Sequence, residues 1–214
     1  MDKDKSYRVE LTLGIATDTQ DAEGHVVERR QVNLTEQQIT ETINHFIGKI
    51  KQVPPMYSAV RIKGKRLYEL AREGLTVERE AREVEIYSIN IIKIFNNNTK
   101  AIFDVVCSKG TYIRTLCADI GEKLGCGGHM SFLVRTRAGE FDIGNALTLE
   151  DISGLAAQGK LDAKLVKVEE IFKNLNRIAL NEFNTKRFLN GSFVRINDLD
   201  VKSGEILAVY NNLN

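Results

Sequence analysis

A chain of 214 residues can bury one hydrophobic core, or form one domain with a small appendage. Hydrophobic residues make up 43% and charged residues 28%, which is typical of globular proteins, and no apolar run approaches the roughly 20 residues that span a bilayer. The N-terminal stretch MDKDKSYRVE carries charge but lacks the apolar segment of a secretory signal. We therefore expect a cytoplasmic protein with no membrane partner.

Metal binding is not expected from the cysteines and histidines. They lie far apart and form no CxxC pair; the cysteines are Cys107, Cys117 and Cys126, and the histidines are His25, His45 and His129. A structural zinc site needs closely spaced thiolates or imidazoles. The sequence therefore predicts reduced, mostly buried thiols and no metal.

The net charge of +1 gives no overall signature of a polyanion-binding protein, but the charge is uneven. The segment 49–66 contains no acid and six basic residues, which are Lys49, Lys51, Arg61, Lys63, Lys65 and Arg66. Such a run can follow a phosphate backbone, or it can be a solvated surface stretch. Charge alone does not decide between these interpretations.

The first half of the chain alternates between strand and helix signals. Residues 6–15 have period two, with Tyr7 and alternate apolar residues on one face, which predicts a strand. Thr35 stands three residues before Gln38, the spacing of a capping box at the start of a helix. Pro54 and Pro55 end that helical segment. A short extended piece and a short helix over 65–74 follow.

The second half begins with two β-rich runs, 82–95 and 100–108, joined by three asparagines that favour a hairpin turn. A helix is expected from about Thr111 to Gly125, then a strand over 129–137 and a helix opening at Thr148. Residues 176–214 contain short extended runs, FVRIN and EILAVY, and predict a small β-rich appendage. Together these elements predict an α+β fold with a mixed sheet.

Common enzyme motifs are absent, since the chain has no GxGxxG, no P-loop and no GxSxG. The run CSKGTYIR, residues 107–114, is more informative, because it follows an apolar strand and opens a helix. Arg114 lies one turn into that helix, flanked by Ile113 and Leu116. It is either an exposed charge or a cation drawn inward, and in the second case it requires a carboxylate partner.

These residues closely resemble a motif of the TruB family of tRNA pseudouridine synthases, which isomerise the T-loop uridine at position 55 of tRNA. Four segments resemble the family in the family's order: 5–24, 54–74, 107–116 and 122–141. Together they extend over most of residues 5–150. The resemblance is therefore carried by several motifs and not by one.

The resemblance implies the pseudouridine synthase fold, with a mixed central sheet and an inserted RNA-gripping thumb at about residues 49–74. It implies a catalytic-fold domain over 1–172 and a partial PUA-like RNA-binding appendage over 176–214. The partner would be the T stem-loop of tRNA, bound by a protein that is a monomer when intact. The six basic residues of 49–66 would then contact RNA phosphates.

The resemblance also implies site residues. Tyr7 matches the tyrosine that stacks on the flipped uracil and takes part in proton transfer, Tyr112 a residue that contacts the base, and Leu133 an apolar residue that packs against it. Arg114 matches the arginine that pairs with the catalytic carboxylate and keeps it ionised. The isomerisation has no redox step, so no cofactor is expected. Without the resemblance, the first three would pass for core side chains.

One family feature is missing: no Gly-x-Leu-Asp-Pro-x-Ala segment, which carries the nucleophilic aspartate, occurs in these 214 residues. Asp18 and Asp21 belong to a different family motif, and Asp119 is interpreted as a surface charge or local pair. We therefore expect Arg114 to lack a carboxylate partner and the chain alone to be inactive. A non-catalytic tRNA-binding module is the alternative, and a fragment and an inactive paralogue both remain open.

Overall fold

The computed structural model describes residues 4–62, 64–196, 201–202 and 204–211. The chain divides into two compact units, Met1–Ala146 and Leu147–Asn214. The division expected from the resemblance, with one domain over 1–172 and an appendage over 176–214, stays a prediction.

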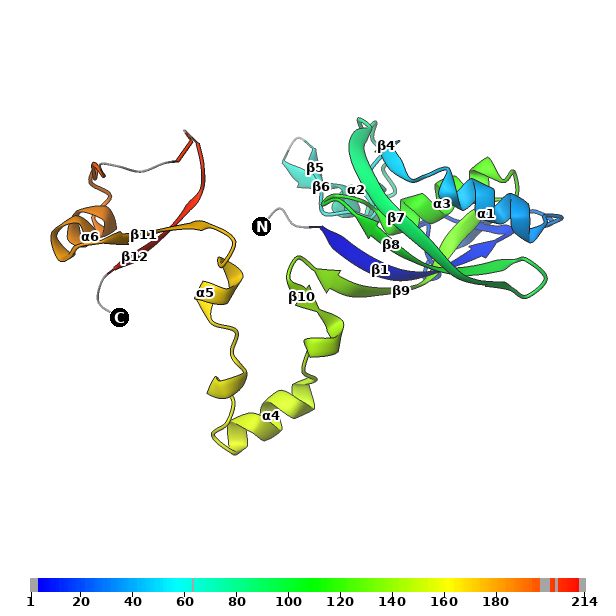
Figure 1. Ribbon diagram of the computed structural model, residues 1–214. Helices are drawn as coiled ribbons and strands as arrows, with labels where there is room; N and C mark the ends of the chain where they lie inside the picture. Colours follow the sequence, from blue (N-terminus) through cyan, green and yellow to red (C-terminus); the bar gives the residue numbers. More distant parts are fainter. Residues whose placement is uncertain (1–3, 63, 197–200, 203, 212–214) are drawn as a thin grey trace. The chain divides into compact units, whose positions relative to one another are not determined.

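The first unit is built on a six-stranded sheet with the order β10-β9-β1-β8-β7-β4 (Figure 1). Its strands are β1 (Lys5–Leu13), β4 (Gly48–Gln52), β7 (Arg82–Phe95), β8 (Lys100–Cys107), β9 (Gly128–Ala138) and β10 (Phe141–Asp142). The α+β class is confirmed, but all these pairings are antiparallel where a mixed sheet was expected. One reason is local: β7 and β8 form a tight hairpin through Asn96–Asn98, all three with positive φ.

Smaller elements surround this sheet. They are the strand pairs β2 (Ile15–Thr17) with β3 (Val26–Arg29) and β5 (Arg61–Ile62) with β6 (Lys65–Arg66), the helices α1 (Glu36–Asn44), α2 (Leu67–Arg72) and α3 (Ile113–Lys123), and the 3-10 turn η1 (Ile143–Asn145). The capping box predicted at Thr35 is confirmed, because its hydroxyl accepts from the main-chain N–H of Gln38 and the Gln38 side chain accepts from the Thr35 N–H.

The core of this unit lies on one face of the sheet, beneath α1 and α3 (Figure 1). The alternation predicted for β1 is confirmed, since Val9, Leu11 and Leu13 are buried. They pack with alternate residues of β8 and with apolar side chains of both helices, among them Phe103, Val105, Ile39, Ile43, Leu116 and Ile120. At about 25 cal/mol for each Å² of apolar surface removed from water, this face is the main source of stability.

Close main-chain packing fixes α3 against β9. A Cβ on Gly121 would collide with the main chain of Gly127 and Gly128. Gly125 ends the helix with a φ of 75°, and its N–H donates to the carbonyl of Glu122. The glycine-rich run 125–128 thus contains the helix end expected at Gly125 and a packing contact between α3 and β9.

The second unit contains α4 (Leu149–Ala157), the 3-10 turn η2 (Asp162–Lys164), α5 (Val168–Ile171), β11 (Asn176–Leu180), α6 (Glu182–Leu189) and β12 (Leu207–Asn211). Strands β11 and β12 pair in parallel. The sequence prediction was incomplete here, because α6 was not expected. It was also wrong for Phe193–Ile196, which form no strand, and Asn197 lies outside the described residues.

Among the described residues, no helix is long and apolar enough to span a membrane.

Candidate active site

Arg114 and Asp21 form a part-buried ion pair at the start of α3. Arg114 Nη1 lies 3.0 Å from Asp21 Oδ2, and the two side chains are 24% and 19% exposed. Arg114 Nη2 also donates to the main-chain carbonyl of Tyr57 at 2.6 Å. The inward interpretation of Arg114 is therefore the one the structure supports.

This pair corrects the expectation that Arg114 has no carboxylate partner. Asp21 belongs to the loop motif TDTQDAEG and not to the segment with the family nucleophile, so the sequence does not point to it as the partner of Arg114. The loop nevertheless lies beside β9, where the N–H of Met130 donates to the carbonyl of Gln20 at 3.0 Å. This contact brings Asp21 to the beginning of α3, 93 residues away from it in sequence.

The loop holds the Asp21 carboxylate in one orientation. Asp21 Oδ1 accepts from the hydroxyl of Thr19 at 2.5 Å and from the N–H of Glu23 at 3.2 Å, which leaves Oδ2 directed at Arg114. Gly24 allows the turn to close, because a Cβ there would collide with Thr19 and Asp18. The turn-forming residues of this motif therefore hold the Asp21 carboxylate in the orientation that pairs with Arg114.

Tyr7 and Leu133 lie on neighbouring strands. In the pairing of β1 with β9, Tyr7 is opposite Arg135, and Val9 is opposite Leu133, so all four belong to the helix-covered face. Burial raises the pKa of the half-buried Tyr7 hydroxyl, and nearby Cys107 adds to this effect. A hydrogen bond with Arg135 acts in the opposite direction. The hydroxyl is therefore protonated at neutral pH and can donate a hydrogen bond.

Tyr112 is the N-cap residue of α3, so the helix starts one residue beyond it rather than near Thr111. The hydroxyl of Thr111 instead donates to the carbonyl of Ser108 at 2.9 Å, which closes the turn before the helix. The main chain of Tyr112 is bonded by the side chain of Gln52, which is almost fully buried. Gln52 was not singled out from the sequence, although a glutamine at the end of a half-buried strand is a signal for a side-chain bond to main chain.

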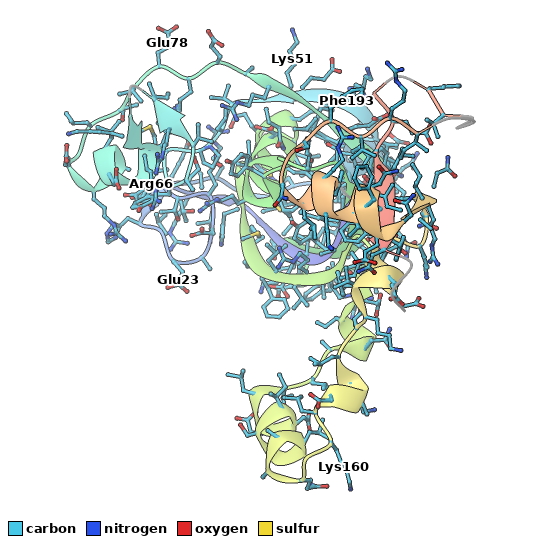
Figure 2. All side chains as sticks on the ribbon, turned by 90° about the vertical axis from the view of Figure 1, so that its left-hand side faces the viewer. Glu23, Lys51, Arg66, Glu78, Lys160 and Phe193 are labelled. Atoms are coloured by element: carbon cyan, nitrogen blue, oxygen red, sulfur yellow. The ribbon has the colours of Figure 1, made fainter. Side chains whose placement is uncertain are left out.

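The basic segment does not form one uniform patch. Lys49 and Lys51 lie on β4, the edge strand of the sheet, and Lys51 points away from the ribbon (Figure 2). Lys49 is paired with Glu83 at 3.1 Å, which raises the pKa of the lysine. The chain then leaves the sheet and returns at Arg82.

The segment 53–81, which connects β4 to β7 and is called the excursion below, carries the remaining basic residues. Arg61 lies on β5 and is exposed, while Lys65 on β6 is 3.7 Å from Glu73. Arg66 donates to the Tyr68 hydroxyl at 2.8 Å and is labelled on this segment in Figure 2. Lys63 lies outside the described residues. The excursion is thus a small two-stranded and helical element with exposed cations.

Asp119 was interpreted as a surface charge or a local pair, and this needs correction. Its side chain is half-buried on α3, and burial raises the pKa of the carboxyl to about 6. No group of His, Cys, Asp or Glu side chains suited to a metal ion occurs among the described residues.

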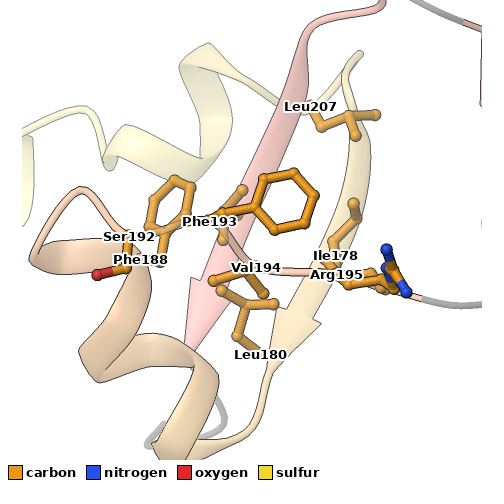
Figure 3. A pocket seen from close by; sticks show the side chains of 10 residues that line it. Ile178, Leu180, Phe188, Ser192, Phe193, Val194, Arg195 and Leu207 are labelled. Carbon is orange, nitrogen blue, oxygen red and sulfur yellow. The ribbon is translucent and has the colours of Figure 1, made fainter.

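The second unit has a cavity of about 500 Å³ (Figure 3). Its lining is mostly apolar and consists of Ile178, Leu180, Phe188, Ser192, Phe193, Val194, Arg195, Ile196, Leu207 and Val209. None of the residues that the TruB resemblance implicates lies in this cavity. The candidate site is therefore the start of α3 in the first unit.

Solved structures show what kind of fold this is. The chain superimposes on a protein in a Cbf5–Nop10–Gar1 complex with a TM-score of 0.68 and 23% identity, over 99% of this chain and 57% of the other. A chain in an H/ACA ribonucleoprotein bound to a substrate RNA containing 2′-deoxyuridine gives a TM-score of 0.67 at 20% identity, over 99% and 56% of the two chains. At these identities the likeness concerns the fold alone.

The sequence comparisons define the family. Residues 1–113 match the TruB family pseudouridylate synthase N-terminal domain, and residues 114–178 match the tRNA pseudouridylate synthase B C-terminal domain. The chain belongs to the TruB family of pseudouridylate synthases, as the resemblance of its four segments indicated.

Two relatives illustrate the likeness. The tRNA pseudouridine synthase B of Alkaliphilus oremlandii is 47% identical over 199 residues, which are 93% of this chain and 65% of the relative. That of Clostridium tetani is 43% identical over 215 residues, which are 98% and 72% of the two chains. The chain thus spans about two thirds of the length of these relatives.

Proposed function

We propose that this chain supplies the RNA-binding surface and most of the uridine pocket of a tRNA pseudouridine synthase acting on the T-loop uridine at position 55. The observation that carries this proposal is the Arg114–Asp21 ion pair beside Tyr112, on a chain of the TruB family. Relatives named tRNA pseudouridine synthase B support the choice of tRNA as substrate. No cofactor and no metal take part.

The reaction breaks the N-glycosidic bond of uridine, turns the uracil and rejoins it to the ribose through carbon. Tyr7 stacks on the base once it has left the loop, Leu133 packs against it, and Tyr112 contacts it. The protonated Tyr7 hydroxyl is available to donate to the uracil during proton transfer. These roles come from the resemblance, and the half-buried position of Tyr7 supports its role.

Arg114 has the role of orienting carboxylates. A guanidinium offers five N–H donors, and Asp21 and the Tyr57 carbonyl engage two of its N–H groups. The nucleophilic aspartate of the family, in its Gly-x-Leu-Asp segment, would bind the same guanidinium without displacing Asp21. We therefore propose that these 214 residues alone form no pseudouridine, although they contain an acid beside Arg114.

The excursion between β4 and β7 is proposed as the thumb that holds the RNA backbone. Exposed cations on a small element outside the sheet can contact phosphates without reading the sequence. Replacing Lys63, Lys65 and Arg66 together by alanine is expected to weaken binding of a T stem-loop. The slope of log K against log salt should become shallower by about 0.7 to 0.9 for each phosphate that the variant no longer neutralises.

A matched control is the triple alanine variant of Arg29, Lys93 and Lys123. These residues are exposed and lie outside the excursion, and their replacement removes the same number of positive charges. Equal loss of binding in both variants would mean that net charge, and not the thumb, binds the RNA. Pseudouridine formation on the same stem-loop is measured in parallel. Turnover by the 214 residues would contradict the proposed inactivity, while binding without turnover also fits the alternative of a non-catalytic tRNA-binding module.

Those two functions are separated by a second experiment. A Gly-x-Leu-Asp-Pro-x-Ala segment of the kind that the family resemblance implies is joined in frame before residue 1, together with the strands that accompany it in the family. Isomerisation by this fusion supports the synthase, because the pocket then needs only the nucleophile. A fusion that binds the stem-loop and remains inactive favours the binding module.

A further inference from the structure

Gln52 makes an unusual pair of contacts. It is the last residue of β4, its side chain is 2% exposed, and both ends of its amide bond the main chain of Tyr112. Gln52 Oε1 accepts from the Tyr112 N–H at 3.0 Å, and Gln52 Nε2 donates to the Tyr112 carbonyl at 3.2 Å. The Gln52 side chain thus bonds both the N–H and the carbonyl of a residue 60 positions away, as the main chain of a neighbouring β-strand would.

These bonds fix the backbone where the pocket and the helix meet. Tyr112 has extended dihedral angles, φ −98° and ψ 106°, and no side-chain cap. Its carbonyl also accepts from the N–H of Leu116 at 3.0 Å, so α3 begins from the same peptide that Gln52 holds. Arg114 follows two residues later. The directions of the Tyr112 and Arg114 side chains therefore depend on the main chain of Tyr112. We call the two hydrogen bonds by which the Gln52 side chain holds it the clamp.

Gln52 also stands where the excursion leaves the sheet, directly before Val53 and the two prolines. A second contact connects the same two segments, with the roles of side chain and main chain exchanged: Arg114 Nη2 donates to the main-chain carbonyl of Tyr57 at 2.6 Å. Residues 52–57 and 112–114 are thus held together at both ends by side-chain bonds to main chain. The base of the excursion and the start of α3 form one connected unit.

We propose that Gln52 is a positioning residue for the uridine pocket: it sets the main chain of Tyr112 and couples it to the base of the thumb. The inference rests on the proposed function for its consequence, which is recognition of the flipped uridine. The clamp itself is a property of the chain without RNA. The two parts can therefore be tested separately.

The test uses the full chain and two substitutions. Gln52→Met keeps the length and bulk of the side chain and removes both hydrogen bonds. Gln52→Glu keeps the acceptor for the Tyr112 N–H and replaces the donor by an oxygen that faces the carbonyl. Gln38→Met is the matched control, because Gln38 also bonds main chain, but in the capping box of α1.

Amide hydrogen exchange without RNA tests the clamp. The Tyr112 amide is expected to exchange about tenfold faster in Gln52→Met than in the parent chain, and to stay protected in Gln52→Glu, where its acceptor remains. Gln38→Met should leave it unchanged. Unchanged exchange at Tyr112 in folded Gln52→Met would overturn the inference.

Binding of two T stem-loops tests the consequence: one carries uridine at the target position and the other an abasic ribose. In the parent chain the uridine loop should bind more tightly, and Gln52→Met and Gln52→Glu should reduce this preference by up to about tenfold, with little change for the abasic loop. Equal losses for both loops would mean that Gln52 only maintains the fold. Absence of any stem-loop binding by the parent chain would refute the proposed function, while the exchange result still decides whether the clamp exists.

Discussion

The substitution Asp21→Asn tests the ion pair on which the site is built. Asparagine keeps an oxygen that accepts from Thr19 and from the Glu23 N–H, so the loop retains its shape. It places an NH₂ group where Oδ2 lies 3.0 Å from Arg114 Nη1, and two donors then face each other. The arginine loses its charge partner but keeps its bond to the carbonyl of Tyr57.

The expected loss follows from the burial of the pair. Exposed ion pairs contribute about 0–1 kcal/mol, and removing one partner of a fully buried pair costs about 3–5 kcal/mol. With side chains 24% and 19% exposed, this pair lies between the two cases. We expect Asp21→Asn to lower the free energy of unfolding by about 2 kcal/mol, which is a decrease in Tm of roughly 4–8 °C for a domain of this size.

Urea denaturation at neutral pH measures this loss, with Glu122→Gln as the control. Glu122 pairs with Arg30 at 3.2 Å but is 71% exposed, so its substitution should change the unfolding free energy by less than about 0.5 kcal/mol. A double-mutant cycle of Asp21→Asn with Arg114→Met should give a coupling energy of about 1 kcal/mol or more. Equal effects of Asp21→Asn and Glu122→Gln, or no coupling, would refute the structural importance of the pair.

Two further substitutions test the packing and electrostatics of α3. Gly121→Ala should destabilise the first unit by about 1–3 kcal/mol, because the new Cβ meets the main chain of Gly127 and Gly128. The control is Gly154→Ala on α4, where the Cβ meets open space, so this change should be neutral or stabilising by up to about 1 kcal/mol. Thermal denaturation compares the two variants. Burial raises the pKa of the Asp119 carboxyl in the folded protein to about 6, above its value in the unfolded chain. The protonated carboxyl therefore favours the folded state fully at pH values below the unfolded pKa, and this stabilisation is lost as the pH rises through 6. Asp119→Asn should therefore stabilise the protein by about 1 kcal/mol at pH 8, after discounting for partial exposure, and have little effect below pH 4. Equal gains at both pH values would show that the carboxyl does not titrate as stated.

Local signals in the sequence were sufficient for the elements that hold the core. The alternation of β1, the capping box at Thr35 and the asparagine turn at 96–98 each depend on a few adjacent residues, and all three are present. The helix α6 and the irregular path of Phe193–Ile196 were not predicted. In that region the extended character of FVRIN predicts a strand, but strand pairing needs a neighbour that the sequence pattern does not identify.

The contacts of the site were beyond sequence pattern for a different reason. Asp21 and Arg114 are 93 residues apart, and Gln52 and Tyr112 are 60 apart, so neither pair has a periodic or spacing signal. The requirement for a carboxylate near an inward arginine is predictable from desolvation, but the identity of that carboxylate depends on how the loop 17–24 pairs with the edge of β9. The roles of Tyr7, Tyr112 and Leu133 with substrate stay predictions.

The ion pair changes how the pocket is expected to assemble. If Arg114 had no partner, its position would depend on the family nucleophile, and a chain without that residue would not be a fair test of RNA recognition. Asp21 and the Tyr57 carbonyl already orient the guanidinium, and Gln52 holds the peptide two residues before it. The start of α3 is thus preorganised by residues of this chain. We therefore expect recognition of the uridine to be separable from its isomerisation, so that RNA binding by these 214 residues would test the proposed pocket.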